Sequence, residues 1–253
     1  MTKDPAFDPG LARDTSAVYA DLTYGHQLAL AFLDRAQITT PADKVGRRAG
    51  QLFLRILELA GGCLALHDAK FFTPIPIVAR SSVEAVADLL CLQKDPAHLD
   101  SIDLRNLNQD HMLWSDPNAL QNEAVKKGLE HPTAAEDFEW LKSKREALEG
   151  ATYRIKKVFK EAGLEQTYAV RYNRLSVEAH NNGSSLYERH VGIDPISGAK
   201  GPAYLKYPTQ ATELGLDSAR HCLKIGLNVI AEMFNRMELL RELDGLSPKP
   251  TSD

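Results

Sequence analysis

The chain has 253 residues, of which 43% are hydrophobic and 25% are charged. This is the composition of an ordinary globular protein, and it excludes a largely disordered chain. The 30 Lys and Arg against 34 Asp and Glu give a net charge of −4, which excludes a surface that is basic throughout, as a dedicated nucleic-acid-binding surface would be. With 16 Gly and 13 Pro, a fibrous or low-complexity protein is excluded as well.

The first residues, 1–5, are polar and lead into no apolar segment of the kind found in a signal peptide. No uninterrupted apolar run approaches the ~20 residues that a membrane-spanning helix needs. Cys63, Cys91 and Cys222 are odd in number, far apart and outside any Cys-x-x-Cys pair, which favours buried reduced thiols over disulfides or a metal site. We therefore expect a cytoplasmic protein that does not associate with membranes.

Apolar residues recur at spacings of three, four and seven over most of the chain, which predicts helices rather than strands. The sequence contains no β-rich stretch of any length and no internal repeat. The predicted fold class is all-α, a multi-helix bundle with a long irregular connection, rich in glycine and proline, before the last helix. The predicted helices cover about residues 17–37, 42–69, 76–93, 96–113, 117–129, 133–162, 166–181 and 209–243.

We divide the chain into an N-terminal extension with a peripheral helix (1–40), a helical bundle domain (41–245) and a disordered tail (246–253). Glycine and proline gather in residues 182–208, where a short hairpin is expected around 194–198. A connection of this length is often functional, for instance as a lid, but it can also be an insertion particular to one family.

The usual motifs of cofactor and metal chemistry are absent from the sequence. It contains no GxGxxG or GxxxxGK[ST] phosphate-binding loop, no HExxH zinc motif and no GxSxG nucleophile turn. We therefore expect no cofactor and no metal ion. The candidate site has to be sought among polar side chains on helices that are otherwise patterned for burial.

Arg80, Glu84 and Asp88 recur at intervals of four residues on a helix whose other positions are largely apolar. Residues four apart differ by only ~40° around a helix, so the three side chains share one side. An intrahelical ion pair on a solvated face explains such a triplet without any function. Ser81 and Ser82 make the opposite side polar as well, which narrows the apolar stripe and favours a position of Arg80 and Glu84 inside the bundle, where charges need partners.

A second polar stripe consists of Tyr172, Ser176 and His180, again four residues apart. The helix dipole stabilises a histidine cation near a helix C-terminus, and Tyr172 and Ser176 can be ordinary hydrogen-bonded groups of a core. We expect Arg80 and Glu84 to meet this stripe in one buried or cleft-lining cluster, with Glu84 paired to Arg80 or to His180.

The order of these residues along the chain resembles a bacterial family of helical proteins known only as a domain of unknown function. The resemblance covers about residues 45–240, and it implies a fold and a set of site residues but no reaction. It is carried by three short motifs, Arg80-x3-Glu84-x3-Asp88, Lys94-Asp95-Pro96 and Tyr172-x2-Leu175-Ser176-x3-His180.

Arg174 and His180, separated by five residues, also resemble the Arg–His motif of the HEPN superfamily of helical bundles, many of which are metal-independent RNases. The resemblance implies that His180 acts as acid and base toward the 2′-hydroxyl of RNA, that Arg174 stabilises charge on the phosphate, and that the site lies across a homodimer interface. The product would be a 2′,3′-cyclic phosphate. Six residues turn a helix by ~600°, so the two side chains converge only where the helix frays or a second subunit contributes.

Basic residues gather between positions 141 and 160, where seven Lys and Arg stand against two Glu. Such a run can bind a phosphate backbone, although it is often only a solvated face. The residues that we select as RNA contacts are Lys156, Lys157, Lys160 and Arg171.

The leading hypothesis is a HEPN-like nucleic-acid enzyme that acts as a dimer in stress or phage defence. Two alternatives remain open: a non-catalytic helical interaction module whose polar cluster fixes the helix register, and a protein that binds a small ligand in the same place.

Overall fold

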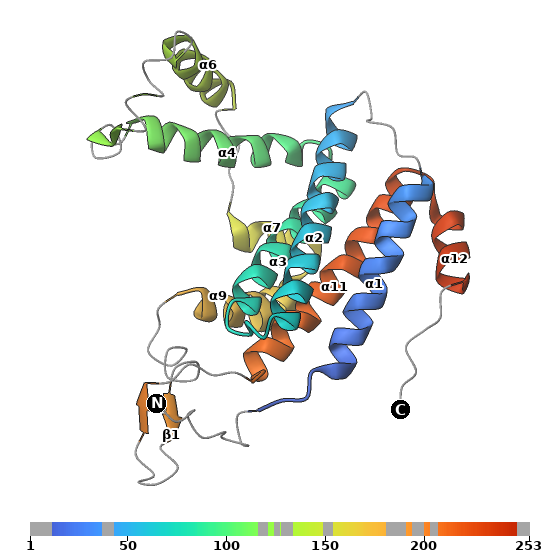
Figure 1. The fold of residues 1–253 in the computed structure, drawn as a ribbon. Helices are drawn as coiled ribbons and strands as arrows, with labels where there is room; N and C mark the ends of the chain where they lie inside the picture. The colour runs from blue at the N-terminus through green and yellow to red at the C-terminus, as the bar shows by residue number, and fades with distance from the viewer. Residues whose placement is uncertain are drawn as a thin grey trace.

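The computed structural model describes residues 12–36, 43–115, 121–123, 127, 134–148, 154–180, 191–193, 200–202 and 207–246. These residues form a bundle of helices and one two-stranded hairpin, which confirms the predicted all-α fold class (Figure 1). Four long helices lie side by side in its centre: α1 (Ser16–Ala36), α2 (Lys44–Asp68), α3 (Ile75–Lys94) and α11 (Gln210–Met233).

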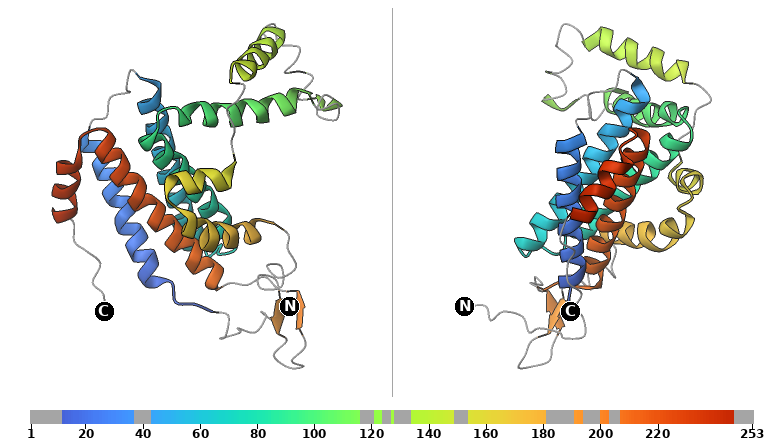
Figure 2. Two further views of the ribbon diagram at one scale, coloured as in Figure 1. Left: turned by 180° about the vertical axis from the view of Figure 1, so that it is seen from behind. Right: turned by 90° about the vertical axis from the view of Figure 1, so that its right-hand side faces the viewer.

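The other elements extend from this four-helix core or cover it. One end of α3 is continued by α4, which carries α6 and projects away from the bundle, whereas the segments from α7 to α9 lie along α3 (Figure 2). The remaining helix, α12, packs against α1 and α11. The bounds of these elements are α4 (His98–Ser115), α6 (Ala134–Ala147), α7 (Ile155–Ala162), α8 (Glu165–Thr167), the π-helix η2 (Tyr168–Tyr172), α9 (Asn173–Ala179) and α12 (Met237–Leu246).

The core lies where α11 packs against α2 and α3. Phe53 and Ile56 of α2, Val83 of α3, and Leu216 and Leu223 of α11 are each at most 1% exposed. Burial of one such side chain stabilises a fold by about 1.5–3 kcal/mol. The spacing of three residues between Phe53 and Ile56, and of seven between Leu216 and Leu223, belongs to the pattern that predicted these helices from the sequence.

Helix α1 belongs to this core and is not the peripheral helix that the sequence suggested. Leu22, Ala29 and Phe32 are fully buried, and α1 packs against α11, α2 and α12. The spacing of seven and three residues puts the three side chains on one face of α1. The helices that pack against α1 come mainly from the C-terminal part of the chain, α11 and α12. The predicted boundary at residue 40 therefore does not separate α1 from the bundle.

Two segments that were predicted as single helices are divided in the structure. Residues 133–162 contain α6 and α7, and α7 begins after Arg154, which is extended (φ −131°, ψ 114°). Residues 209–243 contain all of α11 and most of α12, with Asn235 between them in the left-handed region (φ 53°). Asparagine tolerates this conformation better than most residues, and the turn folds α12 back against α1.

The predicted hairpin is present. Strand β1 (Val191–Ile193) pairs antiparallel with β2 (Lys200–Pro202), and Gly192 lies opposite Gly201. The residues between the strands, where the turn was predicted, lie outside the described residues, as do most of the predicted helix 117–129 and the tail beyond residue 246.

Among the described helices, α2 is the one with the length and apolar composition that could cross a membrane. Within the bundle its residues Phe53, Ile56 and Cys63 are buried, and the helix packs between α3 and α11. Burial of apolar side chains against neighbouring helices is typical of a core helix in a helical bundle.

Candidate functional site

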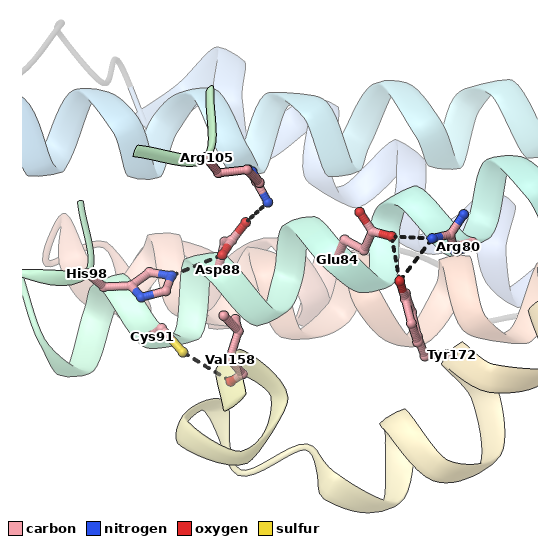
Figure 3. A network of polar contacts seen from close by, with 8 residues as sticks. All are labelled: Arg80, Glu84, Asp88, Cys91, His98, Arg105, Val158 and Tyr172. Atoms are coloured by element: carbon pink, nitrogen blue, oxygen red, sulfur yellow. Dashed lines mark hydrogen bonds and ion pairs between the residues drawn. The ribbon is translucent and has the colours of Figure 1, made fainter. Parts of the chain in front are cut away.

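Arg80 and Glu84 of α3 meet Tyr172 of η2, as the sequence predicted (Figure 3). The Arg80 Nη2 atom donates a hydrogen bond of 2.9 Å to the Tyr172 hydroxyl, which itself donates to Glu84 Oε1 at 3.0 Å. Arg80 Nη2 also lies 3.1 Å from the same carboxylate oxygen. The three side chains therefore form a closed triangle, which we call the Arg–Glu–Tyr triad.

The triad is only partly withdrawn from solvent, because the side chains of Arg80 and Glu84 remain 28% and 32% exposed. Burial raises the pKa of Tyr172; the hydrogen bond from Arg80 opposes this rise and the charge of Glu84 adds to it. Burial acts to lower the pKa of Arg80, but the hydrogen bond to Tyr172 and the charge of Glu84 outweigh it and raise the pKa. At neutral pH the tyrosine is therefore a neutral hydroxyl between two opposite charges.

Ser176 and His180 do not complete the cluster that the sequence predicted. The Ser176 hydroxyl donates to the backbone carbonyl of Tyr172 at 2.7 Å, one helical turn back, as serines within helices often do. Helix α9 ends at Ala179, and His180 is its extended, exposed C-cap (φ −102°, ψ 150°). The carboxylate of Glu84 is engaged by Arg80 and Tyr172 rather than by His180.

Asp88 belongs to a different polar centre at the far end of α3. His98 Nε2 lies 2.9 Å from Asp88 Oδ1, and Arg105 Nη1 lies 2.9 Å from Oδ2 (Figure 3). The carboxylate is only 1% exposed and His98 only 6%. Eight residues separate Asp88 from Arg80, and this rotates the side chain by ~80° as well as moving it two turns along the helix. Asp88 therefore faces the start of α4.

Sequence reasoning did not select His98 or Arg105, although a signal for them was present. Asp95 and Pro96 end α3, and the Asp95 side chain accepts a hydrogen bond of 2.9 Å from Ala97 N. This turn starts α4 four residues after α3 ends and brings the first turns of α4 over the C-terminal end of α3. A buried acid about two helical turns before such a chain reversal can be expected to find its partners just after it.

The basic residues predicted to contact RNA are only partly gathered in one place. Lys156, Lys157 and Lys160 line an open cavity of about 590 Å³ between α7 and η2. Arg154, two aromatic residues, Phe159 and Tyr168, and the single acid Glu165 line it too. We call this cavity the basic groove. Asn173, the residue before Arg174, also contributes to its wall.

Arg171, the fourth predicted RNA contact, points elsewhere. Its Nη1 atom lies 2.6 Å from Asp217 Oδ2 and donates to the Ser218 hydroxyl at 3.3 Å. Burial acts to raise the pKa of Asp217, but the hydrogen bonds from Arg220 and Arg171 lower it overall. Arg171 thus fastens η2 to α11 and does not line the basic groove; its contact with RNA stays a prediction.

Arg174 lies in the first turn of the short helix α9, and His180 is the C-cap of the same helix. Arg174 Nη2 lies 3.9 Å from Glu178 Oε1, whose side chain is 1% exposed. The π-helix η2 ends one residue before α9 begins, and π-helical turns are frequent at functional sites. Because α9 ends at Ala179, the regular helical rotation that would hold the two side chains ~120° apart no longer applies to His180.

The three cysteines are reduced and buried, which confirms their prediction as buried thiols. Burial raises the pKa of each thiol to about 12. One of them, Cys91, lies near His98 and Glu161, so that one ligand atom from each of these residues lies within 4.8 Å of the other two.

Replacement of Tyr172 by Phe removes the hydroxyl that bridges Arg80 and Glu84. We expect the free energy of unfolding to fall by about 1–2 kcal/mol, since hydrogen bonds to charged groups contribute about 1.5–3 kcal/mol and the direct Arg80–Glu84 contact remains. Urea denaturation measures this change. The control is Tyr168→Phe, at the ring stacked on Tyr172, and an equal loss in both variants would contradict the triad.

Replacement of Asp88 by Ala leaves His98 and Arg105 without their shared carboxylate. We expect a loss of about 1–3 kcal/mol in the free energy of unfolding, because the buried His98 ring loses the carboxylate that accepts its hydrogen bond and keeps an unsatisfied donor. The control is Asp34→Ala, at an exposed position of α1, which should change stability by less than about 0.5 kcal/mol. A loss below about 1 kcal/mol for Asp88→Ala would show that this centre carries little of the stability.

Comparison with known proteins places this fold and these residues in a family. No curated protein matches the chain, and no solved structure matches it. The model of a protein family described as "Family of unknown function (DUF5677)" matches residues 47–197, which is more than half of the chain and includes the Arg–Glu–Tyr triad, Arg174 and His180. The chain belongs to the DUF5677 family.

Proposed function

We propose that this protein binds RNA along the basic groove and cleaves it at Arg174 and His180, as a HEPN-like, metal-independent RNase. The observation that carries the proposal is the basic groove itself. Four cations, Arg154, Lys156, Lys157 and Lys160, line one open cavity against a single acid, and the cavity wall continues to the residue before Arg174. The whole protein has a net charge of −4, whereas the lining of this cavity is strongly positive.

The groove suits single-stranded RNA in size and in chemistry. A volume of about 590 Å³ is within the range of pockets that hold a drug-sized ligand. Lysine and arginine bind phosphates and release counterions from them. Tyr168, which is stacked on Tyr172 at a centroid distance of 5.3 Å, offers a partly exposed aromatic wall for a base.

The proposed chemistry needs no metal ion. The neutral imidazole of His180 takes the proton of a ribose 2′-hydroxyl, the 2′-oxygen attacks the adjacent phosphorus, and the bond from phosphorus to the 5′-oxygen breaks. The departing 5′-oxygen takes up a proton from the imidazolium or from water, and a 2′,3′-cyclic phosphate remains. Arg174 stabilises the charge on the phosphate oxygens, for which a guanidinium is well suited.

The proposal includes a homodimer in the cytoplasm. A second copy would bring a second Arg174 and His180 to the same RNA. The resemblance to HEPN proteins implies such a site across a homodimer interface. The exposed position of His180 at the end of α9 is compatible with a site that two subunits share.

The cleavage step is tested by incubation of total RNA with the protein in EDTA. We expect the wild type to cleave, and His180→Ala and Arg174→Ala to cleave at least about 100-fold more slowly, as general acid–base catalysis contributes about 10²–10⁴-fold. His26→Ala, in α1, is the histidine control and should retain the rate. No cleavage by the wild type, or equal cleavage by all variants, would remove the RNase proposal.

The binding step is tested separately with a short fluorescein-labelled single-stranded RNA and anisotropy measurements. We expect the double variant Lys156→Gln/Lys160→Gln to bind at least about tenfold more weakly, and the slope of log K against log salt to fall in magnitude by about 1.4, since each lost phosphate contact contributes ~0.7 for single strands. Lys44→Gln/Lys224→Gln, with the same change in net charge, is the control. Equal affinities and slopes for the two double variants would contradict RNA binding in the groove.

The alternative function, a non-catalytic interaction module, is favoured by the Arg–Glu–Tyr triad. The Tyr172 hydroxyl, Glu84 Oε1 and Arg80 Nη2 contact one another, as in a cluster that fixes helix register. If the protein binds RNA but does not cleave it, the non-catalytic interaction module is favoured. The basic groove would then be the RNA-binding surface of that module.

A further inference from the structure

A second constellation of chemically active side chains lies on the other side of α7 from the basic groove. Cys91 comes from the end of α3, His98 from the start of α4 and Glu161 from the end of α7. One ligand atom from each lies within 4.8 Å of the other two. The three residues line a cavity of about 280 Å³ together with Lys94, Asp95, Ala97, Ser101 and Lys157.

His98 is held as a metal-binding histidine would be. A carboxylate can only accept hydrogen bonds, so the 2.9 Å contact between His98 Nε2 and Asp88 Oδ1 requires the proton on Nε2. In the neutral ring this leaves the lone pair on Nδ1. Arg105 fixes the other oxygen of Asp88 at 2.9 Å. Metal-binding histidines almost always donate their second ring nitrogen to a carboxylate or carbonyl in this way.

Among the described residues, the partners of the other two groups are weak or exchangeable. The Cys91 thiol donates to the backbone carbonyl of Val158 at 3.3 Å (Figure 3). The Glu161 carboxylate is 49% exposed and pairs with Lys157 at 3.5 Å. A surface ion pair of this kind contributes little free energy, so a stronger ligand for the carboxylate can displace the lysine.

We propose that Cys91, His98 and Glu161 bind one divalent transition-metal ion of the zinc type, with water as its fourth ligand. A thiolate, an imidazole and a carboxylate are the three ligand types that zinc accepts. Zinc–ligand bonds of about 2.0–2.3 Å in a tetrahedral arrangement place the ligand atoms about 3.4–3.6 Å apart. The three ligand atoms lie within 4.8 Å of one another, and the Glu161 side chain, which is 49% exposed, has room to turn its carboxylate toward Cys91 and His98.

The proposed ion would join three helices, α3, α4 and α7. Glu161 lies in the last turn of α7, while Cys91 and His98 lie on α3 and α4, so the ion fastens α7 to the end of the bundle. It would also release Lys157 from Glu161, and Lys157 lines both this cavity and the basic groove. The metal site stands without the RNase proposal, because none of its three ligands takes part in that chemistry.

The experiment uses the full chain, freed of metal with a chelator and dialysed, and then titrated with Co²⁺ and with Zn²⁺. We expect one ion per chain, an absorption band from thiolate-to-cobalt charge transfer, and a rise in the melting temperature with Zn²⁺, because an ion that binds only the folded state stabilises it. Cys91→Ser should abolish the cobalt band, whereas Cys63→Ser should keep it.

Glu161→Gln provides a second variant that leaves the core untouched, because this side chain is on the surface. We expect it to weaken Zn²⁺ binding at least tenfold, while Glu165→Gln, four positions further along the chain at the start of α8, keeps the wild-type affinity. The proposal is overturned if the wild type binds neither ion, if the band persists in Cys91→Ser, or if Glu161→Gln binds as tightly as the wild type. None of these results depends on RNA.

Discussion

The structure depends on the need to pair three charges on a buried helix. Helix α3 is covered along most of its length, yet it carries Arg80, Glu84 and Asp88. A charge withdrawn from water needs a partner. Arg80 and Glu84 pair with each other, and the further partners of the three come from segments that follow α3 in the chain. Tyr172 brings η2 to the middle of the helix, and His98 brings α4 to its end. The polar residues therefore position the elements that cover α3.

The sequence allowed the helices and one polar contact to be predicted, because both follow from regular spacing. Arg80 and Glu84 lie one turn apart, and the stripe of Tyr172 has the same period, so their meeting could be expected. Regular spacing does not reveal where a helix stops. The end of α9 at Ala179 removes His180 from its stripe, and the turn at Asn235 divides the last helix.

Charge along the sequence is a weaker guide than spacing, because it does not show which partner each side chain finds. Lys156 and Arg171 were both selected as RNA contacts from their charge. Arg171 is engaged by Asp217, 46 positions further on, whereas Lys156 remains exposed in the groove. Asp88 shows the same limit. Its spacing joined it to Arg80, whereas its partners lie beyond the end of its own helix.

Helix α7 connects the two proposals, although it has only eight residues. Val158, Phe159 and Ala162 form its buried face, so its remaining side chains are divided between the basic groove on one side and the cavity of Cys91 on the other. Lys157 borders both. A short helix gains little stability from its own hydrogen bonds, so its position depends on that buried face and on contacts at its ends. Any ligand that binds Glu161 therefore acts on the orientation of the groove lysines, because Glu161 and these lysines belong to the same short helix.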